Sequence, residues 1–195
     1  MIRVYLIRHG ATAGNLQRRY IGRTDEPLCD TGVRQVQALQ AQDLHVDWLF
    51  VSPLLRARQT ADILFPHMPL HLVENMRETD FGLFEGKTAA ELADVPAYQA
   101  WVDSQCTGPI PNGEDVSHFK ARCRAAFARA IADVKDGACA AFVVHGGVVM
   151  AILEGYAQPQ GCFYDYHVGN GGYIACEYSD GALRVLRRFE GGAVL

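Results

Sequence analysis

Two apolar runs in this chain end in the same dipeptide, His-Gly, and no other feature constrains the fold as strongly. The runs at residues 4–7 and 141–144 lead into Arg8-His9-Gly10 and His145-Gly146-Gly147. Short apolar runs that end at glycine are typical of buried strands in a parallel sheet. In open α/β sheets, ligands bind outside the carboxyl ends of the strands. We therefore expect both histidines at the ligand-binding edge of such a sheet.

The residue types around His9 suit covalent catalysis on a phosphate group. A neutral imidazole nitrogen is a good nucleophile, because an unperturbed pKa of about 6.5 leaves much of it unprotonated at neutral pH. Attack on phosphorus needs cations that hold the phosphoryl oxygens, and Arg8 offers a planar fork of donors. Gly10 lets backbone amides approach a ligand, and Thr12 adds a hydroxyl. Taken alone, the motif also fits a strand end with an exposed histidine.

A third segment, residues 52–61, follows another apolar stretch at residues 48–51. Ser52 is a suitable N-cap and Pro53 suits the first helical position, so the sequence predicts a strand, a sharp turn and a helix. Arg56 would then lie one turn into this helix, near a terminus whose dipole favours anions. A solvated surface arginine is the alternative interpretation.

Candidate proton donors lie in an aromatic and acidic segment, residues 77–88. Departure of an alkoxide from phosphorus requires a proton, and a carboxyl group desolvated by aromatic neighbours such as Phe81 can hold one near neutral pH. The candidates are Glu78, Asp80 and Glu85. Thr88 and Glu91 fit a capping box, which predicts a structural role for Glu91.

Hydrophobic patterning places these motifs in an α/β fold. We expect strands near residues 2–8, 47–51, 140–145, 172–178 and 182–188, and helices near 31–43, 53–65, 114–135 and 147–156. Their alternation predicts a layered α/β sandwich. In the helix at 114–135 an apolar stripe predicts a core face, with a solvent-facing row of Arg122, Arg124, Arg129 and Lys135. Residues 88–112 look like an insertion over the site mouth that selects substrates, and we expect the tail at residues 191–195 to fray.

The order and spacing of the motifs resemble those of the histidine phosphatase superfamily, also called the phosphoglycerate mutase-like family, over nearly the whole chain. The motifs are residues 6–12 with Asn15, 22–28 with Gly32, 52–61, 78–86 and 144–147. The resemblance implies a three-layer sandwich with a mostly parallel central sheet. It implies that His9 becomes phosphorylated, and that the group is cradled by Arg8, Arg56 and His145. The acid–base carboxylate of the family falls on Glu78.

The same resemblance implies further residues that line the phosphate or substrate pocket: Thr12, Asn15, Gly22, Arg23 and Gly146. Within the superfamily, residues 81–86 and 111–115 and the short chain are similar to enzymes of the alpha-ribazole phosphatase type, which act on a nucleotide precursor of the cobalamin lower loop. The segment between Glu78 and His145 is shorter than is usual in cofactor-dependent phosphoglycerate mutases. A shorter segment encloses the site less against water, and this favours hydrolysis over return of the phosphoryl group to product.

The resulting hypothesis is a metal-independent phosphomonoester hydrolase. In it His9 attacks phosphorus in line, Glu78 protonates the departing oxygen, and the resulting carboxylate activates water to cleave the phosphohistidine. Because arginines supply the positive charge, we expect neither a metal nor a cofactor. Structural or surface roles are expected for the remaining histidines: His45, His67, His71, His118 and His167. The alternatives are a broad-specificity phosphatase of sugar phosphates or phosphoproteins, a phosphoglycerate mutase, and a non-enzymatic phosphate-binding relative.

Composition sets the remaining expectations. A chain of 195 residues with 49% hydrophobic residues suits one domain, residues 1–195. The net charge of −4 lacks the basic excess expected of a nucleic-acid binder. Six scattered cysteines without a CxxC pair fit reduced thiols in a cytoplasmic protein. No apolar run approaches the roughly 20 residues of a membrane span, and a nucleophile within the first ten residues argues against a cleavable signal. The oligomeric state, monomer or homodimer, is left open.

Overall fold

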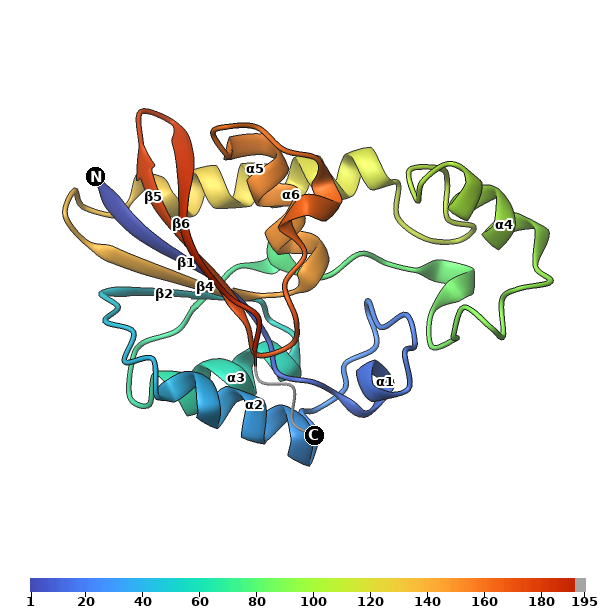
Figure 1. Ribbon diagram of the computed structural model, residues 1–195, viewed down its shortest axis with the longest axis horizontal. Coiled ribbons are helices and arrows are strands. Elements are labelled where there is room, and N and C mark those ends of the chain that lie inside the picture. The colour runs from blue at the N-terminus through green and yellow to red at the C-terminus, as the bar shows by residue number, and fades with distance from the viewer. Residues whose placement is uncertain (192–195) are drawn as a thin grey trace.

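A six-stranded sheet forms the centre of the computed structural model, which describes residues 1–191 (Figure 1). The strands are β1 (Ile2–Arg8), β2 (Trp48–Val51), β3 (His71–Leu72), β4 (Cys139–Val144), β5 (Tyr173–Ser179) and β6 (Ala182–Phe189). They lie in the order β3-β2-β4-β1-β5-β6; the first four are parallel, and β5 and β6 are antiparallel to their neighbours. The mostly parallel central sheet predicted from the sequence is confirmed, while β3 was not predicted because it is only two exposed residues long. Residues 192–195 of the predicted tail lie outside the described residues.

Helices cover both faces of this sheet. They are α1 (Ala13–Leu16), α2 (Asp30–Gln40), α3 (Leu55–Leu64), α4 (Pro96–Asp103), α5 (Val116–Ala132) and α6 (Gly146–Tyr156), with short 3-10 turns η1 (Glu74–Met76), η2 (Gly82–Phe84) and η3 (Phe163–Tyr166). Figure 1 shows α2 and α3 on one side of the strands and α5 and α6 on the other. The predicted three-layer sandwich is therefore confirmed.

Side-chain alternation along the strands divides the core in two. In β1, Val4 and Leu6 are fully buried against the layer of α5 and α6. Ile7, also fully buried, points to the opposite face and packs against the layer of α2 and α3. Because successive side chains of a strand point to opposite faces, a strand buried on both sides is apolar throughout. This explains why the run before His9 shows no polar alternation.

The segment at residues 88–112 builds a small cluster of its own. Helix α4 lies in this segment and extends at one end of the molecule (Figure 1). Its buried Tyr98 and Trp101 pack with Phe84, Leu92 and Ile110, apart from the two larger clusters. The segment therefore forms a separate small apolar cluster at one end of the molecule.

Two local predictions are wrong. Helix α3 begins at Leu55 and not at Pro53. Its N-cap is Leu54, whose N–H donates to Ser52 Oγ at 3.5 Å, and the N–H of Leu55 donates to Asp25 Oδ1 at 2.6 Å. Arg56 is thus the second residue of the helix. The solvent-facing row predicted on α5 also fails at Arg122 and Arg124, which are half-buried because each pairs with a carboxylate of another segment.

All six cysteines, which lie within the described range, are free thiols. No helix in residues 1–191 has both the length and the apolar character needed to cross a bilayer.

Candidate active site

Strands β1 and β4 end side by side, and this brings His9 and His145 together. The two strands are parallel, with Arg8 opposite Val144, and the N–H of His9 donates to Val144 O at 3.0 Å. Each histidine therefore follows the last residue of its strand at the same edge of the sheet. Their ring centres lie 5.1 Å apart with an interplanar angle of 62°. Both side chains are buried, so the alternative of an exposed histidine at a strand end does not hold.

Two contacts define the protonation state of His9. Its Nδ1 lies 2.6 Å from Gly10 O, and a carbonyl oxygen only accepts, so Nδ1 carries the proton. Arg56 Nε donates to the other nitrogen, Nε2, at 3.3 Å. Burial, and then the charges of Arg56 and Arg8, hold the pKa of His9 well below its ordinary value. The imidazole is thus neutral, with the lone pair of a nucleophile on Nε2.

His145 has a buried ring nitrogen without a partner in the described residues. Its Nε2 lies 2.7 Å from Ser52 Oγ, and both side chains are fully buried. Burial, and then Arg56 and His9, hold the pKa of His145 well below its ordinary value, so the ring is neutral. When the Ser52 hydroxyl donates to Nε2, the proton lies on Nδ1, which has no hydrogen-bond partner within residues 1–191. Buried donors without a partner are rare and call for a ligand or another explanation.

Arg8 also carries a buried nitrogen without a hydrogen-bond partner among residues 1–191, its Nε. Its Nη1 donates to Val168 O at 2.8 Å and lies 3.3 Å from His167 Nε2. Its Nε is buried, and no acceptor in the described part of the chain reaches it. A methyl group at Gly146 would lie only 3.3 Å from Arg8 Cζ, so the glycine allows close packing of helix α6 on the guanidinium. Unsatisfied donors beside His9 on both Arg8 and His145 describe an anion site.

Arg56 is fully buried, which excludes the surface alternative, whereas Arg58 is exposed. Besides His9, its guanidinium binds three backbone carbonyls, Thr24 O at 2.8 Å, Gly22 O at 2.9 Å and Ile21 O at 3.5 Å. These contacts hold the guanidinium with its Nε directed at His9. Gly22 therefore acts through its carbonyl, as a support of Arg56.

Glu78 is the candidate acid that lies against this site. Its carboxylate accepts from the N–H of Thr79 and from that of Gly147, both at 2.9 Å. Gly147 is the second residue of α6, directly after His145 and Gly146, so the carboxylate sits at the start of that helix. A methyl group at Gly147 would lie 2.3 Å from Glu78 Oε1, so only glycine permits this approach.

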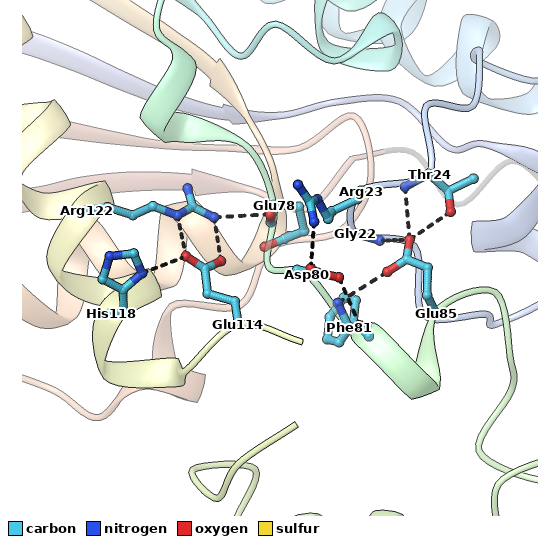
Figure 2. A network of polar contacts seen from close by, with 11 residues as sticks. Gly22, Arg23, Thr24, Glu78, Asp80, Phe81, Glu85, Glu114, His118 and Arg122 are labelled. Carbon is cyan, nitrogen blue, oxygen red and sulfur yellow. Dashed lines mark hydrogen bonds and ion pairs between the residues drawn. The ribbon is translucent and has the colours of Figure 1, made fainter. Parts of the chain in front are cut away.

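The other two candidate acids hold loops together (Figure 2). Glu85 accepts from Gly22 N, from Thr24 N and from the Thr24 hydroxyl, at 2.8, 3.0 and 2.8 Å. Asp80 accepts from the N–H of Gly82 and pairs with Arg23 at 2.9 Å. Neither lines the cavity described below, whereas Glu78 does. The capping contacts between Thr88 and Glu91 form as predicted, at 2.8 and 3.1 Å, but they close a turn and not a helix.

The predicted pocket residues lie in different places. Asn15 and Gly146 line the cavity. Thr12 is fully buried, and its hydroxyl accepts from Asn15 N at 3.3 Å as the N-cap of α1. Arg23 is largely exposed and lines a separate groove on the far side of Glu78.

A cavity of about 360 Å³ opens next to Arg8 and Glu78. Its walls are mostly aromatic or apolar: Tyr20, Phe81, Trp101, Ile110, Phe119, Met150, Phe163 and Tyr164. Trp101 and Ile110, which line this cavity, come from the segment at 88–112. The arginines that line the cavity are Arg8 and Arg19, and Arg19 is paired with Glu91 at 2.8 Å.

Three residues of the site were not identified from the sequence. Ser52, predicted as a helix cap, binds His145 instead. His167, for which a structural or surface role was expected, lines the cavity beside Arg8. Burial, and then the charge of Arg8, lower the pKa of His167. Asn170 donates to His9 O and to Asn15 Oδ1, both at 3.2 Å. For Asn170, the available signal was the turn sequence Gly-Asn-Gly-Gly before the strand β5.

Comparison with known proteins agrees with this geometry. The family model of the histidine phosphatase superfamily (branch 1) matches residues 4–190. "Probable phosphoglycerate mutase GpmB" of Klebsiella pneumoniae (strain 342) is 32% identical over 154 residues, covering 75% of this chain and 70% of the relative. The same-named protein of Escherichia coli O1:K1 / APEC is 30% identical over the same coverage. The crystal structure of the alpha-ribazole phosphatase from Shigella flexneri matches with a TM-score of 0.85 and 26% identity over 96% of both chains.

Proposed function

Because the chain belongs to the histidine phosphatase superfamily (branch 1), we propose that it hydrolyses a small-molecule phosphomonoester through a phosphohistidine at His9. One observation carries the proposal. The neutral His9, with its lone pair on Nε2, lies beside two buried nitrogens that have no partner in residues 1–191, Arg8 Nε and His145 Nδ1, and the latter is a donor when Ser52 donates to His145 Nε2. A phosphoryl group carries its charge on oxygens, and these donors are placed to bind them.

In the first step, His9 Nε2 attacks phosphorus and the bond to the ester oxygen breaks. Arg8, Arg56 and His145 bind the phosphoryl oxygens as negative charge shifts onto them. Glu78 gives its proton to the departing alkoxide, which leaves as an alcohol. The products are the alcohol and a phosphohistidine.

In the second step, the Glu78 carboxylate takes a proton from a water molecule that attacks the phosphohistidine. The nitrogen–phosphorus bond breaks, and the electron pair returns to His9 Nε2. Inorganic phosphate is released, with Glu78 again protonated. Every group in the cycle thus returns to its starting state.

The shape and chemistry of the cavity favour a substrate whose leaving group carries an aromatic ring. Its volume of about 360 Å³ lies within the usual range of small-molecule sites. Apart from Arg8, its arginine is Arg19, which is already engaged by Glu91 and by Gly86 O at 2.6 Å. A carboxylate-bearing substrate such as a phosphoglycerate would lack a free cation there, whereas a planar ring would stack on aromatic walls. Alpha-ribazole 5'-phosphate, a nucleotide with an aromatic base, fits this description.

The test is a comparison of phosphate esters by kcat/KM in the presence of EDTA. The panel contains alpha-ribazole 5'-phosphate, benzyl phosphate, glucose 6-phosphate, phosphoserine and 3-phosphoglycerate. We expect the two aromatic esters to be preferred, and rapid quenching to trap a phosphorylated His9 that His9→Ala does not form. A folded His9→Ala variant with wild-type turnover would refute the proposed nucleophile.

Phosphoglycerate mutase activity is the second candidate, because the named sequence relatives carry that description. Incubation with 3-phosphoglycerate and a trace of 2,3-bisphosphoglycerate separates the two. Hydrolysis releases inorganic phosphate, whereas a mutase forms 2-phosphoglycerate without releasing it. Isomer exchange that exceeds phosphate release would favour the mutase.

A further inference from the structure

Arg122 on α5 binds the backbone that leads into Glu78. Its Nη1 donates to Asn75 O at 2.8 Å and to Arg77 O at 2.9 Å, and its Nη2 lies 3.2 Å from Glu78 O. Three carbonyl groups of one short segment thus converge on one guanidinium. Residues 78–81 belong to no helix or strand, so contacts of this kind, and not a regular backbone ladder, determine where the segment lies.

Glu114 holds this guanidinium in place from the other side (Figure 2). Its two carboxylate oxygens accept from Arg122 Nε at 2.6 Å and from Nη2 at 2.8 Å, a bidentate pair. The N–H of Glu114 also donates to Asp80 O at 3.0 Å, two residues beyond Glu78. The flat face of the guanidinium lies over the ring of Phe119, 4.9 Å from its centre. The pair therefore contacts the segment on both sides of Glu78.

The electrostatics agree with a permanently charged pair. Burial alone acts to lower the pKa of Arg122, but its hydrogen bonds to Glu114 and the nearby negative charge outweigh burial, and the pKa is raised. Burial likewise acts to raise the pKa of Glu114, and the hydrogen bonds and charge of Arg122 lower it overall. Because Arg122 donates to three carbonyls of the loop, its loss would leave these carbonyls without their donor.

We propose that Arg122 and Glu114 are positioning residues for the acid–base carboxylate of Glu78. They fix the backbone of residues 75–80, so that the Glu78 side chain meets the start of α6 and the leaving group. The inference rests on the proposed role of Glu78 in proton transfer. Neither Arg122 nor Glu114 lies at the reacting atoms, since Arg122 acts on backbone carbonyls and Glu114 acts on Arg122.

The test uses leaving groups that differ in their need for a proton. Benzyl phosphate releases an alkoxide that must be protonated, whereas 2,4-dinitrophenyl phosphate releases a stable phenolate. Arg122→Lys keeps the charge but replaces a fork of donors by a single point. We expect its kcat/KM to fall by about 10- to 100-fold on benzyl phosphate and by less than about threefold on dinitrophenyl phosphate, because kcat/KM covers the steps up to departure of the leaving group, and in these Glu78 acts only as the acid.

Arg124→Lys is the matched control, because Arg124 lies on the same helix and is also paired. Its Nε donates to Ala151 O at 3.0 Å and its Nη2 to Glu154 at 2.6 Å, away from the segment of Glu78. We expect this variant to match the wild type on both substrates. Glu114→Gln, which keeps the shape of the side chain and removes its charge, should repeat the selective loss of Arg122→Lys. Thermal unfolding establishes that each variant is folded at the assay temperature.

Combining Arg122→Lys with Glu78→Gln separates the positioning role of Arg122 and Glu114 from the acid role of Glu78. If the pair acts through Glu78, the double variant is no slower on benzyl phosphate than Glu78→Gln alone. Equal losses on both substrates in folded Arg122→Lys and Glu114→Gln, or a further loss in the double variant, would overturn the positioning role while leaving Glu78 as the acid. Wild-type rates in Glu78→Gln would overturn the role of Glu78 and, with it, the positioning proposal.

Discussion

Replacing Gly147 by alanine tests whether Glu78 must lie against the start of α6. A methyl group there would be 2.3 Å from Glu78 Oε1, where ordinary contacts begin near 3.4 Å, and 3.1 Å from Phe119 Cζ. The carboxylate must therefore retreat by about 1 Å, a displacement of a reacting group that can cost about 100-fold in rate. This corresponds to about 2.7 kcal/mol of transition-state stabilisation.

The assay is kcat/KM on benzyl phosphate, with the unfolding free energy measured in urea on the same samples. Overpacking lowers stability by about 1–3 kcal/mol, while replacement of a glycine returns about 0.4–1 kcal/mol by restricting the unfolded chain. A net loss of this size leaves a folded protein. We therefore expect a variant that is folded and slow.

Gly155→Ala is the matched control for this prediction. Gly155 also lies in α6, and a methyl group there would meet Arg124 Nε at 2.6 Å and Cδ at 2.7 Å. These atoms belong to the far end of a flexible side chain and can move away. The control should keep the wild-type kcat/KM. If Gly147→Ala matched it, the position of Glu78 against α6 would have no catalytic importance and the reasoning would be refuted.

Three further predictions concern the buried cations and histidines. Ser52→Ala leaves His145 Nε2 without its partner and should lower the unfolding free energy in urea by about 1–3 kcal/mol; an unchanged value would show that this hydrogen bond is not formed. Burial keeps His9 and His145 neutral in the folded state, so below pH 6.5 the unfolded chain binds more protons than the folded protein. The unfolding free energy therefore decreases as the pH is lowered. For each histidine the slope averages about 1 kcal/mol per pH unit between pH 5 and 7, measured by urea unfolding, and approaches about 1.4 kcal/mol per pH unit well below pH 6.5; a slope that persists in a His9→Asn, His145→Asn double variant would contradict this cause. Arg56→Lys loses the carbonyl contacts that aim its charge, so kcat/KM should fall by about 100-fold or more on benzyl and dinitrophenyl phosphates alike; a loss limited to benzyl phosphate would assign Arg56 to the leaving group.

The parts of the site that follow strands could be predicted from the sequence. An apolar run that ends in His-Gly predicts both a buried strand and the end at which its histidine lies. The parallel strands of such a sheet end at one edge, so His9 and His145 could be assigned to one site without knowledge of the strand order. Their pairing through neighbouring strands β1 and β4 required the structure.

The supporting contacts could not be predicted, because they join segments far apart in the chain. Ser52 is 93 positions from His145. Together with Pro53 it predicted an N-cap at Ser52, whereas the helix begins at Leu55, whose N–H donates to the distant Asp25. On α5, periodicity separates an apolar face from a polar one but does not identify a polar residue at the boundary. Arg122 lies three residues after the buried Phe119 and thus on the same side of the helix, and this was the available clue.

The donors that each buried arginine leaves unused distinguish its role. Arg122 is saturated by Glu114 and three carbonyls, which fits a support. Arg8 keeps a buried Nε without a partner in the described chain, which fits a ligand. Arg56 is intermediate, because its Nε donates to His9 Nε2, whose lone pair attacks phosphorus in the proposed mechanism. When that lone pair bonds to phosphorus, Arg56 loses this acceptor, and a phosphoryl oxygen arrives beside it to replace it. Such an interaction strengthens as the reaction proceeds, and only interactions of that kind accelerate the chemical step.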